Sequence, residues 1–469
     1  MSGAGPREAR APPGDLAVDL VVVKATMSSL RVRRSAALRG TCRVPGDKSI
    51  SHRALLFGAL CEGVVEASGL GQGGDNLSTA AALRALGVEV QLEGGSARIA
   101  GVGFGGLQAA AQSLDCGNSG TTIRLLLGLL AGRPFEPELR GDASLTRRPM
   151  GRVAAPLREM GATIDGRSDP ARPGDVYPPL RVRGGALSGI KHHLEVSSAQ
   201  LKSALILAAL QARGPSELRE PARSRDHTER MLGFLGAPIS VGGGGEIVVD
   251  PSGWNGKLKP ARLTIPGDLS SATFLIVAAL IVPGSDVVVE NVGLNPTRAG
   301  ALDVLRAMGA DLTIDLTGDA MGEPVGRVRA RAGKLRGTRV AGELALRAID
   351  EIPALAVAAA AADGQTTFAD LAELRIKESD RIAALARELG RAGARVEERP
   401  DGLVVTGLAG RSPTGGAVVP EHDHRIAMAG AILGLLGADE TTVPTADIGT
   451  SFPTFAETLG ALGAALDVG

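Results

Sequence analysis

The sequence predicts an α/β protein of two domains, each built from three β-α-β-α-β-β units. The main observation is a repeat in which an amphipathic stretch ends in a glycine, a Val or Ala follows, and a strand-like stretch begins. A glycine just past a helix end can adopt the left-handed conformation that closes the helix. Intervals of 70 to 84 residues separate successive copies, so six units fill the chain after about residue 35. The six glycines are Gly87, Gly161, Gly236, Gly309, Gly393 and Gly463.

The residues around these glycines predict the other elements of the unit. Before the glycine, a Ser, Asp or Asn can cap an amphipathic helix. Capped helices are expected at 77–86 (cap Asp75 or Asn76), 227–235 (cap Asp226) and 381–389 (cap Ser379 or Asp380). After the glycine, apolar residues alternate around a Gly-Gly or Asp-Gly turn, as in a β-hairpin. Hairpins are expected at 88–101, 238–250 and 394–407, and more apolar second helices at 121–131, 199–212 and 271–281.

An internal echo indicates where the chain passes between two domains. The segment VPGDKS (44–49) returns 221 residues later as IPGDLS (265–270), with three units between the copies. We therefore expect one discontinuous and one continuous domain with a cleft between them. The expected boundaries are 36–47 plus 265–469 for domain I and 48–264 for domain II.

The segment 1–35 fits none of the six units. Its first part, Met1–Pro13, is rich in Gly, Ala and Pro. Such segments at chain ends are commonly disordered. We expect 1–35 to be disordered or a non-native extension, with Met27 as an alternative start and a functional tail as the less favoured alternative.

Composition excludes several functional classes. Lys+Arg and Asp+Glu are equal at 51 each, and aromatic residues are only 2%. A nucleic-acid or membrane-surface binder needs a basic excess, and base stacking needs aromatic side chains. The three cysteines form no C-x-x-C pair, and no apolar run reaches the ~20 residues needed to span a bilayer. We expect a cytoplasmic protein that binds neither nucleic acid nor membranes.

Basic and hydrogen-bond-donating residues gather at predicted helix starts in nearly every unit. These segments are GDKSISHR (46–53), GNSGTTIR (117–124), LTRRP (145–149), SSAQ (197–200) and RDHT (225–228). The N-terminus of a helix attracts anions through its free N–H groups and its dipole. GDKSISHR alone fits an anion site and a capped helix with solvated charges equally well. If the six units are pseudo-symmetric, however, the helix starts converge on one cleft suited to a small, multiply charged anion.

Acidic and mixed-charge motifs stand at helix starts in the second half. IDEIP (349–353) carries two carboxylates, and KESDR (377–381) and HDHR (422–425) mix both signs. In isolation, acids at a helix start are usually only favourable dipole partners. The His-x-His pair lacks a second ligand cluster, so a metal site is not expected. Cys116 lacks a neighbouring base, so it is not expected to be a nucleophile.

Together these motifs resemble those of the EPSP synthase (3-phosphoshikimate 1-carboxyvinyltransferase) family, and they run in the family's order over about 430 residues. The further matches are GDASLTRRPMGR (141–152), NPTRAG (295–300), LRIKESDR (374–381) and HDHRIAM (422–428). The resemblance implies a two-domain enolpyruvyl transferase-like fold, an inside-out α/β barrel of six units. It also implies transfer of the enolpyruvyl group of phosphoenolpyruvate to the 5-hydroxyl of shikimate 3-phosphate, in a monomer without a cofactor.

The resemblance also implies roles for individual residues. The expected shikimate 3-phosphate ligands are Lys48, Ser49, Arg53, Ser198, Ala199, Gln200, Arg225, Asp350 and Lys377. The expected phosphoenolpyruvate ligands are Lys48, Gly120, Arg148, Gln200, Arg381 and Arg425. Asp350, Glu378 and Lys48 are the expected catalytic residues, with Asp350 taking the hydroxyl proton and Glu378 protonating the methylene carbon. Such a carboxylate pair is expected to hold two different protonation states.

Two departures and two alternatives accompany this resemblance. RDHTE (225–229) and Thr450 resemble class II of the family, whereas class I carries a phosphoenolpyruvate-binding Lys at the Thr450 position. Gly120 lacks the methyl by which some class II members exclude the inhibitor glyphosate. The alternatives are the sister UDP-N-acetylglucosamine enolpyruvyl transferase and a non-catalytic protein of the same fold. Gly117-Asn118-Ser119, in place of a Cys-bearing loop, favours shikimate 3-phosphate.

Overall fold

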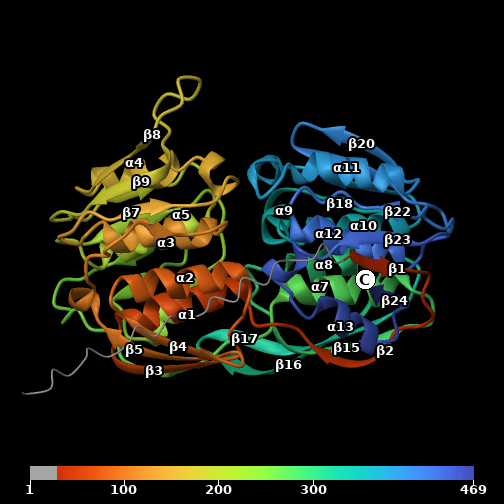
Figure 1. Cartoon of the computed structure of the whole chain (residues 1–469), viewed down its shortest axis with the longest axis horizontal. Coiled ribbons are helices and arrows are strands. Elements are labelled where there is room, and N and C mark those ends of the chain that lie inside the picture. Colours follow the sequence, from red (N-terminus) through yellow and green to blue (C-terminus); the bar gives the residue numbers. More distant parts are fainter. Residues whose placement is uncertain (1–28) are drawn as a thin grey trace, which may run out of the picture.

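The computed structural model describes residues 29–469 and consists of two halves side by side (Figure 1). Within this range, 24 strands form six four-stranded sheets. Every sheet has one parallel and two antiparallel strand pairs. Buried apolar side chains form two separate clusters, one drawn almost wholly from residues 50–265 and the other from 30–38 and 269–462.

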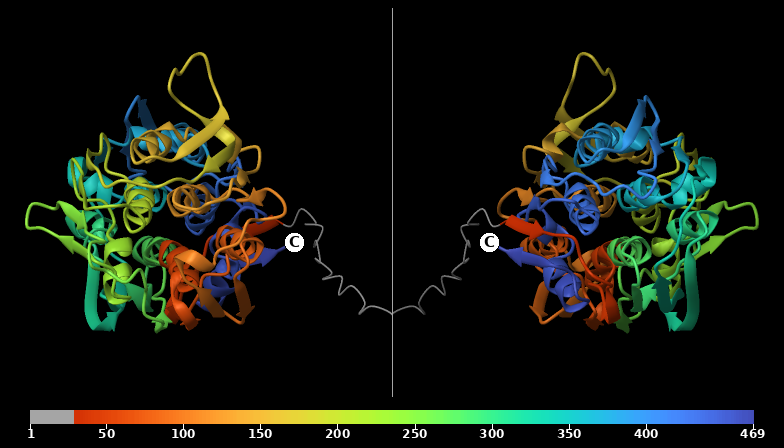
Figure 2. Two further views of the ribbon diagram at one scale, coloured as in Figure 1. Left: turned by 90° about the vertical axis from the view of Figure 1, so that its left-hand side faces the viewer. Right: turned by 90° about the vertical axis from the view of Figure 1, so that its right-hand side faces the viewer.

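The part of the molecule built around the apolar cluster of residues 50–265 is here called the first half. Three sheets cover this cluster. The first is β14 (Arg262–Thr264), β3 (Glu62–Ser68), β5 (Ser96–Val102) and β4 (Glu89–Glu93). The second is β6 (Leu114–Asp115), β7 (Glu138–Arg140), β9 (Tyr177–Arg183) and β8 (Thr163–Arg167). The third is β10 (Lys191–His193), β11 (Ser216–Arg219), β13 (Ile247–Val249) and β12 (Ile239–Val241). The loop between β8 and β9 projects from the top of this half (Figure 2).

Three further sheets cover the second half. The first is β16 (Asp311–Ala320), β17 (Glu323–Arg331), β15 (Asp286–Gly293) and β2 (Arg39–Arg43). The second is β18 (Arg339–Val340), β19 (Gln365–Phe368), β21 (Gly402–Thr406) and β20 (Arg395–Arg399). The third is β22 (Gly416–Ala417), β23 (Thr441–Pro444), β1 (Ser29–Val32) and β24 (Leu466–Val468).

Helices fill the space behind the sheets of each half. The first half contains α1 (Lys48–Leu60), α2 (Gly74–Ala85), α3 (Gly120–Leu130), α4 (Gly151–Glu159), α5 (Ala199–Ala209) and α6 (His227–Phe234). The second half contains α7 (Leu269–Ile281), α8 (Gly300–Ala307), α9 (Gly342–Arg347), α10 (Ile352–Ala361), α11 (Arg381–Arg391), α12 (His424–Gly434) and α13 (Phe455–Ala461). Short 3-10 turns are η1 (Phe104–Gly106), η2 (Leu145–Arg147), η3 (Ala372–Ile376) and η4 (Ile448–Thr450).

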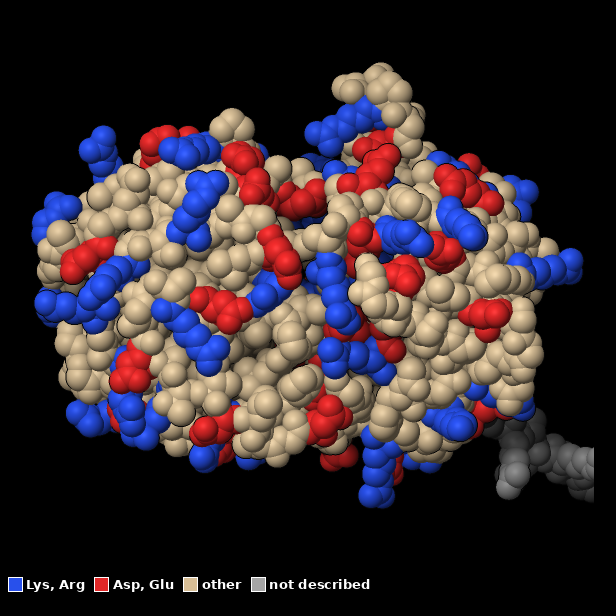
Figure 3. Space-filling model, turned by 180° about the vertical axis from the view of Figure 1, so that it is seen from behind, with Lys and Arg blue, Asp and Glu red and all other residues tan. Residues whose placement is uncertain are grey.

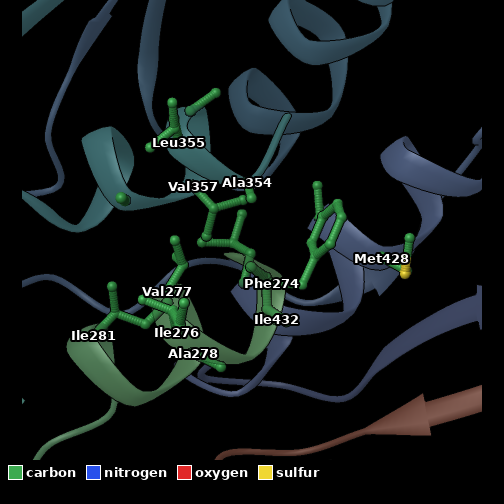
Figure 4. Close-up of a cluster of buried hydrophobic side chains, with 14 of the residues drawn as sticks. Phe274, Ile276, Val277, Ala278, Ile281, Ala354, Leu355, Val357, Met428 and Ile432 are labelled. Atoms are coloured by element: carbon green, nitrogen blue, oxygen red, sulfur yellow. The ribbon is translucent and has the colours of Figure 1, made fainter. Parts of the chain in front are cut away.

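The most apolar helix of each unit lies inside, and the sheets lie outside. In the second half α7, α10 and α12 pack against one another, and all thirteen residues of α7 are buried. Figure 4 shows Phe274, Val357 and Ile432 from these three helices in one apolar cluster. A helix that is apolar on every side needs such a surround, because water would contact any face left open. The predicted inside-out arrangement is confirmed.

The predicted repeat glycines end the expected helices. All six have positive φ, between 83° and 115°, and each lies two residues after the end of a helix. A side chain would be strained in this conformation, so glycine is required there. The repeat in the sequence therefore reflects a backbone requirement at six helix ends.

The N-terminal expectation is wrong for residues 29–35. Ser29–Val32 form β1, which pairs antiparallel with β23 and β24, and Leu30 and Val32 are fully buried. In the sixth sheet β23 and β24 do not pair with each other, and one strand position lies between them. The N-terminal strand takes that place. Residues 1–28, including Met27, lie outside the described part of the chain.

The surface carries both charge signs throughout. Seen from behind, basic and acidic side chains alternate over both halves (Figure 3). Between residues 29 and 469, none of the helices could cross a membrane.

Candidate active site

A cavity of about 230 Å³ lies between the two halves. One wall comes from α1, α3, α5 and the segment before α6, and the other from the segments that lead into α8, α10, α11 and α12. Thirteen of the fourteen residues proposed from the sequence line it. They are Lys48, Ser49, Arg53, Gly120, Arg148, Ser198, Ala199, Gln200, Arg225, Asp350, Lys377, Glu378 and Arg425. Residues spread over nearly 380 positions therefore meet in one space.

Helix caps hold several of these residues in place. In each case a side-chain oxygen accepts a hydrogen bond from a backbone N–H in the first turn, which fixes where the helix begins. These capping residues are Asp47 for α1, Ser119 for α3, Ser198 for α5, Asp380 for α11 and Asp423 for α12. Most of these helix starts lie at the cavity, as the sequence predicts. Their N–H groups and dipoles favour negative charge there.

Asp350 is surrounded by cations from both halves. Its carboxylate lies 2.6 Å from Arg225 of the first half, and 3.6 Å from Lys377 and 3.4 Å from Arg381 of the second. Arg425 donates a hydrogen bond to the backbone oxygen of Asp350 at 2.9 Å. Burial by itself raises the pKa of Asp350, but the surrounding cations, Lys377 foremost, outweigh burial and hold this pKa well below its usual range.

Glu378 faces a similar cationic environment. Its Oε2 accepts a hydrogen bond from Arg381 Nη2 at 2.6 Å. Burial raises the pKa of Glu378. The positive charges around it, those of Arg381 and Lys48 foremost, outweigh burial, so the pKa lies well below the usual value. Both carboxylates are therefore ionised at neutral pH. The expectation that the two hold different protonation states stays a prediction for the substrate complex, because in this form cations surround both and Arg381 pairs with both.

Arg381 is the one proposed residue outside the cavity wall. Its side chain is 1% exposed and reaches Asp423 Oδ2 at 2.7 Å, besides Glu378 and Asp350. A buried guanidinium with three carboxylate partners is fully occupied. Arg381 orients the two carboxylates from behind and does not reach the cavity in this form.

Lys48 pairs with a residue that the sequence analysis assigned differently. Its Nζ lies 3.0 Å from Asp75 Oδ2. The sequence predicts Asp75 or Asn76 as a helix cap, which is wrong, since Gly73 stands at the N-cap without a side-chain hydrogen bond. Burial lowers the pKa of Lys48, but the charges of Asp75 and Glu378 together outweigh burial, and the net shift is upward. Lys48 therefore stays charged.

Arg124 is a second cavity residue that the list of proposed ligands lacks. Its Nη1 donates to Gln200 Oε1 at 2.8 Å, and Gln200 Nε2 donates to Thr121 Oγ1 at 2.9 Å. Arg148 lies beside it and donates to Asn118 Oδ1 at 2.6 Å. The signal was present, because Arg124 ends the motif GNSGTTIR, one turn into α3.

Arg53 is almost fully buried. It is 2% exposed, and its guanidinium donates to Thr228 Oγ1 at 2.6 Å, to Ser203 Oγ at 2.7 Å and to the Ser49 backbone oxygen at 2.9 Å. Burial lowers the pKa of Arg53 to about 10, so it remains charged at neutral pH. These bonds set its orientation at the floor of the cavity.

Comparison with known proteins identifies the family. A family model described as EPSP synthase (3-phosphoshikimate 1-carboxyvinyltransferase) matches residues 32–459. The chain belongs to the EPSP synthase family. A curated family member from Desulforudis audaxviator, named 3-phosphoshikimate 1-carboxyvinyltransferase, is 50% identical over 92% of this chain and 99% of its own length. One from Brevibacillus brevis with the same name is 46% identical over 92% and 99%.

Solved structures of the family agree in fold. An EPSP synthase structure from Acinetobacter baumannii superposes with a TM-score of 0.83 at 41% identity, covering 94% of this chain and all of the other. A second structure of EPSP synthase from that organism gives 0.82 at 40% identity. All the relatives named here are EPSP synthases, and none is a UDP-N-acetylglucosamine enolpyruvyl transferase.

Thr450 does not line the cavity. Thr450 lies in η4, and a Cβ on Gly73 would stand 2.1 Å from the Thr450 backbone oxygen. Thr450 therefore packs against the start of α2 instead of forming the cavity wall. Lys48, Arg124 and Arg148 are among the cations that line the cavity.

The remaining candidates from the sequence differ in exposure. His422 is exposed, with a side chain 93% accessible, and His424 is buried. Among residues 29–469, no three His, Cys, Asp or Glu are grouped so that they could bind a metal ion. Cys116 is a buried free thiol whose pKa is raised by burial and by Asp115, so it does not form a thiolate nucleophile.

Proposed function

We propose that this chain transfers the enolpyruvyl group of phosphoenolpyruvate to the 5-hydroxyl of shikimate 3-phosphate and releases phosphate, a step in chorismate and aromatic amino-acid biosynthesis. The observation that carries the proposal is the cavity wall, where two ionised carboxylates stand among a larger number of cations. Nine Lys and Arg but only five Asp and Glu line the cavity. A positive excess of this kind suits two substrates that each carry a phosphate and a carboxylate.

The first half supplies the proposed shikimate 3-phosphate pocket. Ser49 and Arg53, on the first turns of α1, are assigned to the shikimate carboxylate. Ser198, Ala199 and Gln200 open α5, where free N–H groups suit a phosphate. Arg225 and Lys377 are assigned to the same phosphate. Both now contact Asp350, so the substrate phosphate would take over part of that pairing.

The proposed phosphoenolpyruvate pocket lies between the halves. Lys48, Arg148 and Arg425 are assigned to its phosphate and carboxylate, with Gln200 and the backbone of Gly120 beside them. Arg381 contributes through Glu378 and Asp350, which it orients from behind. Lys48 is shared between the two substrates because it lies where α1 begins, at the boundary of the halves.

The carboxylates are assigned to the proton transfers. Glu378 delivers a proton to the methylene carbon of phosphoenolpyruvate, which leaves positive charge at the neighbouring carbon. Asp350 takes the 5-hydroxyl proton as that oxygen bonds to the same carbon. The new methyl group then returns a proton to Glu378 as the bond between this carbon and the phosphate oxygen breaks, and the leaving phosphate takes the proton that Asp350 had accepted. The reaction involves no net oxidation or reduction, so proton transfer and charge stabilisation are sufficient, and the proposed mechanism uses no cofactor.

Substrate binding prepares Glu378 for the acid role. Arg381, Lys48 and Arg148 now lower its pKa. An anionic phosphoenolpyruvate paired with Lys48 and Arg148 offsets part of that positive charge. The proton affinity of Glu378 therefore rises when the substrate arrives, and the proton is available only in the substrate complex.

A coupled phosphate-release assay tests the proposal. We expect release that depends on both phosphoenolpyruvate and shikimate 3-phosphate, with 5-enolpyruvylshikimate 3-phosphate identified by mass spectrometry. Release with UDP-N-acetylglucosamine in place of shikimate 3-phosphate would assign the chain to the sister reaction. Absence of release with either acceptor would favour a non-catalytic protein of this fold.

Two coarser expectations complete the proposal. One chain supplies every group that lines the cavity, so a monomer is sufficient for the reaction. Light scattering at working concentration tests this. We also place the protein in the cytoplasm, where free thiols such as Cys42, Cys61 and Cys116 stay reduced.

A further inference from the structure

The tip of the β16–β17 hairpin crosses from the second half to the first. Both strands belong to the sheet of β15 and β2, which covers the second half. At the tip, however, Met321 belongs to the apolar cluster of the first half. Arg230, on α6 of the first half, donates a hydrogen bond to the Gly322 backbone oxygen. Figure 1 shows this hairpin running along the bottom of the molecule beneath both halves.

Glu323, the first residue of β17, is a buried charge at this crossing. It is 2% exposed, and its two oxygens have different partners. Oε1 accepts from His227 Nδ1 at 2.7 Å, and Oε2 accepts from Asn295 Nδ2 at 2.7 Å. Asn295 Nδ2 also donates to Asp226 Oδ1 at 2.7 Å. Burying a carboxylate costs free energy unless it is well paired, so these bonds fix Glu323 firmly.

The partners of Glu323 directly follow a proposed substrate ligand. Asp226 and His227 come immediately after Arg225, whose guanidinium enters the cavity. The next residue, Thr228, accepts the 2.6 Å hydrogen bond from Arg53. The sequence predicts Asp226 as a helix cap, but its side chain makes no capping bond and binds Asn295 and Arg230 instead.

We infer that Glu323 is a positioning residue for the shikimate 3-phosphate pocket, holding the segment 226–228 and through it Arg225 and Arg53. This inference rests on the proposed function. Glu323 itself does not line the cavity, so it acts only through His227 and through Asn295. Because its strand belongs to the opposite half, it also couples the relative placement of the halves to the orientation of the two arginines.

Glu323→Gln tests the inference. The amide keeps the volume but removes the charge. With its oxygen toward Asn295 Nδ2 and its Nε2 toward His227 Nδ1, which accepts in the other tautomer, it replaces two charge-assisted hydrogen bonds with two weaker neutral ones. Removal of a negative charge near the pocket would by itself tighten the binding of an anion. Loss of positioning instead weakens it, so the two effects have opposite signs.

Calorimetric titration of the whole protein with shikimate 3-phosphate gives the readout. We expect the dissociation constant to rise about tenfold, as hydrogen bonds to charged groups commonly contribute this much. The kcat at saturating substrates and the KM for phosphoenolpyruvate should stay within about twofold, because the reacting groups are untouched. Asp315→Asn is the matched control, since it removes a carboxylate from the same hairpin, where Asp315 pairs with Arg327 at the surface.

The outcomes separate the alternatives. Unchanged or tighter binding in Glu323→Gln, or an equal loss in the Asp315→Asn control, would overturn the inference. If Glu323→Gln does not fold, Asn295→Ala, which removes the amide that joins Glu323 to Asp226 together with its hydrogen bonds from Thr297, must show the same weakening. If the unaltered protein neither binds shikimate 3-phosphate nor releases phosphate, the proposed function fails instead, and the titration of that protein reveals this first.

Discussion

Glu378→Gln separates catalysis from architecture at the proposed acid. The substitution keeps the shape of the side chain and removes the proton donor. General acid–base groups typically contribute 100-fold or more, so we expect turnover to fall by at least about 100-fold. Binding of shikimate 3-phosphate should change little, because Glu378 is assigned to the other substrate.

The stability cost follows from the partners of Arg381. Removing the only partner of a buried charge typically costs about 3–5 kcal/mol. Arg381, however, keeps Asp423 at 2.7 Å and Asp350 at 3.4 Å, and the new amide oxygen can still accept its hydrogen bond. We therefore expect a loss of only about 1 kcal/mol, the size of one weakened hydrogen bond.

Single-turnover and steady-state phosphate release, together with urea unfolding, measure both quantities. Asp380→Asn is the matched control, because it makes the same chemical change two residues away. Asp380 caps α11 by accepting from Ala383 N at 3.0 Å, and Asn caps helices about as well as Asp. Its turnover should stay near that of the unaltered protein. Turnover of Glu378→Gln within about threefold of that value would mean that Glu378 only orients Arg381, and the acid assignment would be wrong.

Three further predictions address the inhibitor pocket, acid stability and the N-terminal strand. In Gly120→Ala, the added Cβ would meet Arg124 Nη1 at 2.7 Å and Arg148 Nη1 at 3.2 Å. The glyphosate inhibition constant should therefore rise by about 5- to 150-fold, and by more than the KM for phosphoenolpyruvate rises. Equal shifts in the two constants would contradict the pocket assignment. The pKa of Asp350 in the folded state lies below the ordinary 3.8, so its contribution to stability is present above about pH 4 and is lost as the pH falls through the folded-state pKa. The difference in unfolding free energy between the unaltered protein and Asp350→Asn should therefore shrink in acid. A difference that stays constant with pH would refute this. Removal of residues 29–32 in addition to 1–28 deletes β1 and exposes edges of β23 and β24, so the melting temperature should drop relative to a chain that begins at Ser29; an equal melting temperature would contradict this.

Much of the fold could be read from local sequence. The six glycines mark helix ends because a positive φ is a property of one residue and its neighbours. The hairpins and the apolar inner helices follow in the same way from turn chemistry and from residues that tolerate burial on every side. The gathering of the proposed ligands was also predictable in outline, since their motifs stand at helix starts in a pseudo-symmetric set of units.

Errors occurred where one segment is completed by another far away in the chain. Asp75 has the sequence context of a helix cap, yet its carboxylate accepts a hydrogen bond from Lys48, 27 residues earlier in the chain. Residues 29–32 fit no unit in sequence order because they complete the sixth sheet, whose other strands come from the C-terminal end. Propensity and capping rules describe neighbours along the chain, and such pairings lie beyond their range.

The sequence by itself predicted the six-unit α/β architecture, the family and thirteen of the groups that line the cleft, because each depends on residue types at short spacings. The ionisation of Asp350 and Glu378, the position of Arg381 behind the cavity wall, and the Glu323 link between the halves could come only from the folded chain. These properties depend on distances of about 3 Å between side chains that lie up to about 125 positions apart. Coulomb and hydrogen-bond energies change steeply over such distances, and packing alone sets them.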